Sequence, residues 1–145
     1  MRLSDEEALA RLRAHDHGVL CTVHPKRGVD VIPVVYVIDP DGYVALPIDR
    51  VKPKLAPRLQ RERNLERDPR AALLAERWDA SDWTKLWWVR AQLRHEPDPG
   101  EREPALAAAL AGRYPQYRGE APFVRLLVLR IVGLTGWAGT EDATS

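Results

Sequence analysis

The sequence predicts an antiparallel β-barrel or open sheet decorated by helices. About six or seven runs have strand character, against three segments with helical character. The first three strand-like runs follow one another through short turns, which is hairpin order. Strand–helix–strand units do not alternate along the chain, so a doubly wound parallel sheet is not expected.

The N-terminal part is expected to form one helix and a three-stranded antiparallel meander. Ser4 and Glu7 have the spacing of a capping box, and the apolar residues after them predict a helix over residues 5–13. The three strands are predicted over residues 19–23, 31–38 and 43–48. Pro33 cannot donate to a neighbouring strand, so we expect it at a sheet edge, at a bulge or where a ligand approaches the backbone.

Two further helices and three further strands are expected in the rest of the chain. Pro57 suits the first turn of a helix that ends at Asp68 and Pro69. In a later strand, alternation assigns Trp87 to the core face and Trp88 to the opposite face. The other predicted elements are strands over 71–75, 86–93 and 123–132 and a helix over 104–113.

Length and composition limit the class of protein. The 145 residues suit one domain, expected over residues 1–139, with a disordered tail over 140–145. The 22 basic and 21 acidic residues leave a formal charge of +1, so neither nucleic acid nor an anionic membrane is an expected partner. Cys21 is the only cysteine, which excludes an internal disulfide and favours a cytoplasmic location. No apolar run reaches the roughly 18 residues of a membrane span, and the N-terminus does not resemble a signal peptide.

Lys52 and Lys54 form a local cation pair between a predicted strand and a predicted helix. The chain has only four lysines, so their spacing of two residues is unusual. Cations beside the unpaired N–H groups of a helix start stabilise a phosphate, because the helix dipole and the side-chain charges act in the same sense. The alternative for the same residues is a solvated basic turn.

Motifs for hydrolysis or metal binding are not evident. The sequence has no nucleophile elbow and no glycine-rich dinucleotide motif. The four histidines lie in predicted turns, so we expect no metal site and interpret His15 and His17 as solvated turn residues. No carboxylate is marked as a buried acid or base, and no catalytic side chain is assigned. A bound cofactor would then carry the chemistry of an enzyme.

Tryptophan is dense in this chain. Five occur in 145 residues, and Trp83, Trp87 and Trp88 fall within six positions. They are interpreted either as core and interface packing or as the wall of a pocket for a planar ring.

Ten short motifs are distributed along nearly the whole chain. They are Gly18-Val-Leu-Cys-Thr-Val23, Val31-Ile-Pro-Val-Val-Tyr-Val-Ile38, Lys52-Pro-Lys54, Arg58-Leu59, Asn64-Leu65, Asp68-Pro-Arg70, Asp82-Trp83, Leu86-Trp-Trp-Val-Arg90, Arg113-Tyr-Pro-Gln-Tyr117 and Gly136-Trp137. Together they resemble the split-barrel superfamily of pyridoxamine 5′-phosphate oxidase and its flavin and deazaflavin oxidoreductase relatives. The subgroup that the chain resembles most is that of probable coenzyme F420-dependent enzymes.

This resemblance implies a mainly β fold with α elements: a six-stranded antiparallel split β-barrel with about three peripheral helices. It implies a homodimer with a cofactor in each of two clefts between the subunits. The residues that it assigns to the cofactor are Lys52, Lys54 and Arg58 at the phosphate, Ile32, Pro33, Val34 and Val35 along the ring system, Ile48 and Trp88 nearby, and Trp137 with Arg125 reaching toward the partner's cleft.

The implied function is that of an oxidoreductase using F420 for hydride transfer to an unsaturated small molecule. FMN is the alternative cofactor; F420 differs in its acidic tail, for which Arg50, Arg58 and Arg61 could supply cations. A non-catalytic flavin or deazaflavin binder is a further alternative, because no acid or base is evident. A haem-handling protein of the same superfamily would need an axial ligand, for which His24 and His95 are the candidates.

Overall fold

The computed structural model describes residues 1–49, 58–118 and 123–140. Two short 3-10 helices, η1 (Trp83–Lys85) and η2 (Pro115–Tyr117), accompany the main elements. In chain order the main elements are α1 (Asp5–Ala14), β1 (Gly18–His24), β2 (Gly28–Val34), β3 (Val37–Ile38), β4 (Tyr43–Asp49), α2 (Gln60–Arg67), β5 (Arg70–Arg77), β6 (Trp87–His95), α3 (Arg102–Arg113) and β7 (Phe123–Ala138).

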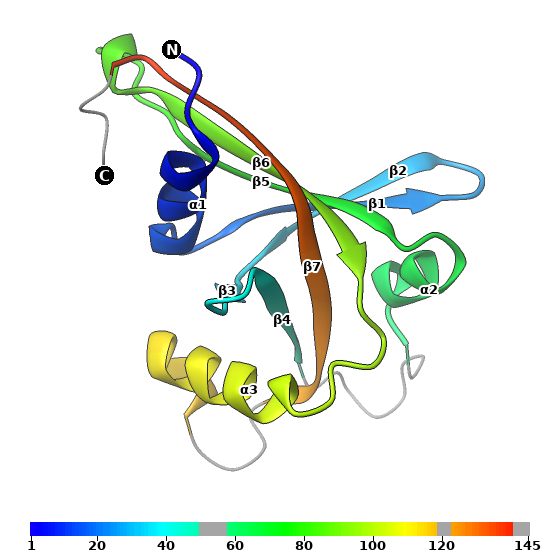
Figure 1. Cartoon of the computed structure of the whole chain (residues 1–145). Helices are drawn as coiled ribbons and strands as arrows, with labels where there is room; N and C mark the ends of the chain where they lie inside the picture. The colour runs from blue at the N-terminus through cyan, green and yellow to red at the C-terminus, as the bar shows by residue number, and fades with distance from the viewer. Residues whose placement is uncertain (50–57, 119–122, 141–145) are drawn as a thin grey trace.

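The strands of the described residues form one antiparallel sheet of seven strands in the order β2-β1-β5-β6-β7-β4-β3. β6 and β7 pair into a long twisted ribbon whose far end carries η1 (Figure 1). α1 packs on this ribbon, α3 on β3 and β4, and α2 against β1 beneath the β1–β2 hairpin (Figure 1). The helices therefore cover separate parts of a strongly curved sheet.

The predicted meander is wrong, because residues 31–38 are not one strand. β2 ends at Val34 and β3 begins at Val37, and the two strands lie at opposite ends of the sheet. Between them Tyr36 is fully buried, and its hydroxyl donates a hydrogen bond to the Leu12 carbonyl at 2.6 Å. Burying this side chain holds the backbone on a path from one end of the sheet to the other, so the ladder with β1 cannot continue.

The fold class is confirmed as mainly β with an antiparallel sheet and three α-helices among the described residues. The expected number of six strands is wrong, since the divided run makes the described sheet seven-stranded. The sheet is not closed, because β2 and β3 are its two ends and do not pair with each other.

The start of α1 follows from local chemistry, and the other two helices follow the prediction less closely. Ser4 and Glu7 form the predicted capping box, with the Ser4 hydroxyl accepting from Glu7 N at 3.1 Å and the Glu7 carboxylate accepting from Ser4 N at 3.0 Å. The described part of the second helix begins at Gln60, and Pro57 lies outside the described residues. α3 begins at Arg102, two residues before the expected start, with Pro104 still in its first turn.

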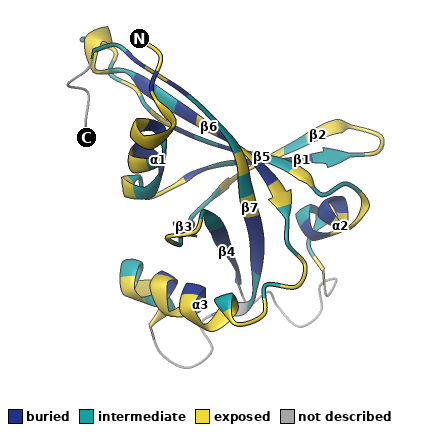
Figure 2. Ribbon diagram, in the orientation of Figure 1, coloured by how far each residue is buried: buried dark blue, intermediate teal, exposed yellow. Residues whose placement is uncertain are grey.

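The core lies inside the curve of the sheet (Figure 2). β6 buries Trp87 and every second residue after it to Leu93, while Trp88 and its alternates lie on the outer face, as the alternation predicted. β5 and β7 also confirm predicted strands, and β7 continues six residues beyond the expected end, to Ala138.

Two further expectations concern the C-terminal tail and membrane-spanning segments. Of the expected tail, Thr140 is described, and its hydroxyl donates to the Thr84 carbonyl at 3.3 Å; residues 141–145 lie outside the described residues. Within the described ranges, none of the helices has the length and apolar character needed to cross a bilayer.

Candidate functional site

A pocket of about 290 Å³ opens where β2 ends. Pro33 is on the outermost strand of the sheet, which confirms the edge position expected for a residue without an N–H. The pocket is lined by His17, Pro33, Val34, Val35, Leu46, Pro47, Arg61 and Tyr117. Residues from β2, β4, α2, η2 and the α1–β1 turn therefore meet around one concavity.

The backbone behind this pocket is held by two tyrosines. The Tyr114 hydroxyl lies 2.7 Å from the Asp16 carbonyl oxygen and 3.0 Å from the Tyr36 carbonyl oxygen, and its single proton can be donated to either. Burial raises the pKa of Tyr36, so its hydroxyl stays protonated and continues to donate to Leu12. These bonds join the β2–β3 connection to α1, to the α1–β1 turn and to the residue between α3 and η2.

The α1–β1 turn brings together three side chains of types that can ligate a metal ion. The ligating atoms of His15, Asp16 and His17 lie within 4.8 Å of one another, and His17 Nδ1 is 2.5 Å from Asp16 Oδ1. Arg113 donates to the carbonyls of residues 13, 14 and 15, which fixes the turn but also places a cation beside it. Burial lowers the pKa of His15. The sequence led us to expect that His15 and His17 are solvated turn residues. His17 is exposed, but His15 is half-buried and its ring lies edge-on to Trp87, with the ring centroids 5.1 Å apart.

α2 supplies the cation of the pocket, Arg61, and is fixed by a partly buried ion pair. The Glu62 carboxylate accepts from Leu59 N at 3.0 Å and from Arg125 Nε at 2.6 Å. Burial opposes the negative charge of Glu62, but the Arg125 guanidinium and the Leu59 N–H outweigh it and lower the pKa of Glu62. Arg125, expected near the partner's cleft, thus holds α2 within its own protomer.

The predicted phosphate residues are only partly described. Lys52 and Lys54 lie outside the described residues. Arg58 is exposed and forms an ion pair with Glu66 of α2. Arg61, which the sequence suggested only for an acidic tail, lines the pocket itself.

The other predicted site residues are distributed over three places. Pro33, Val34 and Val35 line the β2 pocket, whereas Ile32 is 37% exposed on the edge strand. Ile48 is 1% exposed and belongs to the core, so its side chain does not face a ligand in this protomer.

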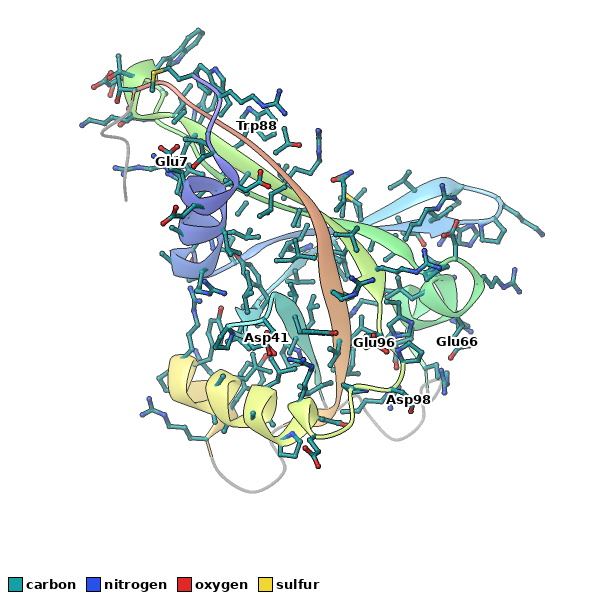
Figure 3. All side chains as sticks on the ribbon, in the orientation of Figure 1. Glu7, Asp41, Glu66, Trp88, Glu96 and Asp98 are labelled. Carbon is teal, nitrogen blue, oxygen red and sulfur yellow. The ribbon has the colours of Figure 1, made fainter. Side chains whose placement is uncertain are left out.

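Trp88 and Trp137 line a second hollow, on the outer face of the β6–β7 ribbon. They are paired across the two strands, and the hollow of about 660 Å³ around them is mostly apolar. The Arg90 guanidinium lies 5.5 Å from the Trp88 ring centroid. β5 and β1 separate Trp88 from β2 in the sheet, and Figure 3 shows Trp88 far from Glu66 on α2. One protomer therefore keeps the tryptophan wall apart from the β2 pocket.

Several pocket residues were not assigned to the cofactor site from the sequence. His17, Leu46, Pro47 and Tyr117 lie in separate elements, and their shared position depends on the pairing of β4 with β7 and on the bonds of Tyr114. Only Tyr117 belonged to a motif, the turn that follows α3.

No family model matches this sequence, and no curated protein shows significant similarity to it. Among solved structures, an FAD-binding protein from Mesorhizobium loti has a TM-score of 0.69 at 16% identity, over 94% of this chain and 95% of that chain. A putative pyridoxamine 5′-phosphate oxidase from Corynebacterium glutamicum has a TM-score of 0.59 at 20% identity, over 94% and 90% of the two chains. The haem storage protein HutZ from Vibrio cholerae has a TM-score of 0.63 at 18% identity, over 92% and 94%.

At these identities the likeness is one of fold. The same antiparallel sheet and peripheral helices occur in proteins whose names refer to FAD, pyridoxamine phosphate and haem. The chain therefore shares the split-barrel fold of these proteins.

Proposed function

We propose that this protein binds a flavin-type cofactor at the β2 pocket and acts as an oxidoreductase, with the deazaflavin F420 as the preferred cofactor and FMN as the alternative. The observation that carries the proposal is the lining of that pocket. Apolar Pro33, Val34 and Val35 form a surface suited to a planar ring, and Arg61 supplies a cation beside it. The cation pair Lys52 and Lys54 precedes α2 in the sequence, next to Arg58.

The chain's own residues would bind and orient the cofactor. Pro33 to Val35 would support the ring, while Lys52, Lys54, Arg58 and Arg61 would neutralise its phosphate and other acidic groups. When bound, the cofactor supplies two-electron hydride chemistry toward a small unsaturated substrate. The protein's part is to hold the ring, to place the substrate and to exclude water.

A homodimer is part of this proposal. Cys21 and Val31 pair on the outer face of the β1–β2 hairpin, as do Val19 and Pro33. Val31 is 62% exposed, and β2 has no further strand beside it among the described residues. A second copy covering this face would bury the apolar residues and could bring its Trp88 and Trp137 to the β2 pocket, the stacking wall that one protomer lacks.

The test is a fluorescence titration of the purified protein with F420 and, separately, with FMN. We expect saturable binding of F420 and weaker binding of FMN. The double variant K52A/K54A should bind F420 more weakly by about 2 to 4 kcal/mol, because charge-assisted bonds to phosphate are lost. R94Q/R130Q removes two exposed charges from the β6–β7 ribbon and should bind as the wild type does.

Unchanged affinity in K52A/K54A would contradict the phosphate assignment. If neither cofactor binds with a dissociation constant below about 100 μM, which corresponds to roughly −5.5 kcal/mol, the proposed function is contradicted and only the fold remains. Tight binding without turnover of unsaturated substrates would favour a non-catalytic carrier. A Soret band in the purified protein would favour the haem alternative.

A further inference from the structure

A basic pocket of about 320 Å³ lies on another side of α2, between that helix and the turn of the β1–β2 hairpin. It shares no lining residue with the β2 pocket. Three of its lining residues are cationic and none is acidic. The polar residues of this pocket are His24, Lys26, Gln60, Arg63, Asn64 and Arg67.

The cations converge because helix spacing and a buried amide place them together. Residues 60, 63, 64 and 67 recur at helical intervals and share one side of α2. Asn64 is fully buried, and its Nδ2 donates to Thr22 Oγ1 at 2.9 Å and to Asp30 Oδ2 at 2.8 Å. These bonds hold α2 against the hairpin that carries Lys26.

The positive charge of this pocket is not compensated by nearby carboxylates. Lys26, Arg63 and Arg67 form no ion pair with any residue in the described ranges. The acidic residues close to them are each paired with a different arginine: Asp30 with Arg27, Glu62 with Arg125, Glu66 with Arg58 and Asp68 with Arg70. Like charges gathered in one concavity repel, and an anion bound among them relieves that repulsion.

His24 adds a neutral donor to this pocket. Its Nδ1 accepts hydrogen bonds from Lys26 N and Arg27 N, both at 3.0 Å. The neutral ring must then carry its proton on Nε2, which is left to donate. The charged side chains and His24 thus offer N–H groups without a carboxylate acceptor, which suits an oxyanion and disfavours a metal ion.

We propose that this basic pocket binds a small multivalent oxyanion, a phosphomonoester or a polycarboxylate. Three cations on two elements match a ligand with two or more negative charges, since each oxygen can accept from a separate donor. The overall charge of +1 means that the attraction is local to this pocket. The proposal does not depend on a cofactor in the β2 pocket.

The test uses inorganic phosphate and citrate as probes, in titrations followed by amide NMR at constant ionic strength. We expect saturable shifts at Lys26, Gln60 and Arg63, and no such response to chloride. The variant R63Q/R67Q should weaken binding by at least about tenfold, since charge-assisted bonds are lost. Both residues are exposed, so the variant is expected to fold.

R94Q/R130Q has the same change in net charge away from the pocket and should bind both probes as the wild type does. K26M removes the hairpin cation without changing α2 and should also weaken binding. The proposal is overturned if neither probe gives saturable shifts, if R63Q/R67Q binds unchanged, or if R94Q/R130Q loses affinity equally.

A competition experiment identifies the source of the anion. If citrate and F420 compete in the wild type but not in R63Q/R67Q, the pocket holds the acidic part of a longer ligand. If both bind together, the pocket holds a free anion. Either result supports the site, because each requires saturable binding at these residues.

Discussion

Buried polar side chains help to determine how the elements of this fold are arranged. Asn64 and Tyr36 are fully buried, and Glu62 is nearly so. Each makes hydrogen bonds across elements that are distant in sequence: Asn64 to Thr22, Tyr36 to Leu12 and Glu62 to Arg125. A buried polar group without a partner is costly, so each bond favours one arrangement of the elements over its alternatives.

Asp30 gives a pH-dependent prediction at the residue scale. Hydrogen bonds from Arg27 and Asn64 lower the pKa of Asp30 to about 2, below the 3.8 of an unperturbed aspartate. A lowered folded-state pKa stabilises the protein above about pH 4, and this contribution is lost as the pH falls toward about 2. We expect D30N to be less stable than the wild type near pH 6 and to approach it near pH 2.

Urea unfolding at pH 6, 4 and 2 measures this difference. D98N removes an exposed loop carboxylate without an ion pair in the described ranges and serves as the control. A constant gap between D30N and the wild type across these pH values would contradict the assigned role of Asp30.

Individual elements were predictable where their determinants are local. The capping box of α1 and the alternation along β6 depend on residues close in sequence, and both match expectation. The division of residues 31–38 was not predictable, because it results from burying Tyr36 against α1 and from the pairing of β3 with β4. Both are contacts between distant parts of the chain.

The ion pair of Glu62 and Arg125 yields a prediction at the element scale. E62Q should destabilise the protein by about 1 to 3 kcal/mol, because Arg125 loses its charged partner and Leu59 N a strong acceptor. E62Q/R125M should recover part of that loss, since it also removes the Arg125 charge that has lost the Glu62 carboxylate. Urea unfolding of the wild type, E62Q, R125M and E62Q/R125M gives the coupling free energy between the two side chains. Additive effects would show that the pair does not hold α2.

The whole molecule presents two separate surfaces that we propose to be halves of one cofactor site. The β2 pocket has an apolar surface and a cation, and the tryptophan hollow has stacking surface on the β6–β7 ribbon. Within one protomer β1 and β5 lie between the strands that carry them. A second copy is the simplest means of joining these halves, which makes oligomeric state the decisive property at this scale.

V31D tests the proposed dimer. Val31 is 62% exposed, so the carboxylate costs little in a monomer, but at a dimer interface it would be buried without a partner. We expect the dissociation constant of the dimer to rise by at least about a hundredfold, or ~3 kcal/mol. A108D places the same charge on the exposed side of α3 and should remain dimeric. Light scattering across a concentration series measures both; a wild type that is monomeric throughout would contradict the proposed assembly.

The sequence by itself determined the mainly β class, the start of α1 and the core face of β6, and it gave a sheet edge as one of three positions for Pro33. These depend on the chemistry of neighbouring residues: capping, alternation, and the missing N–H of proline. Only the tertiary structure decided that β2 and β3 lie at opposite ends of the sheet, that Ile48 is core, and that Arg61 enters the β2 pocket. Strand order and pocket lining depend on contacts between residues far apart in the chain, which no local pattern specifies.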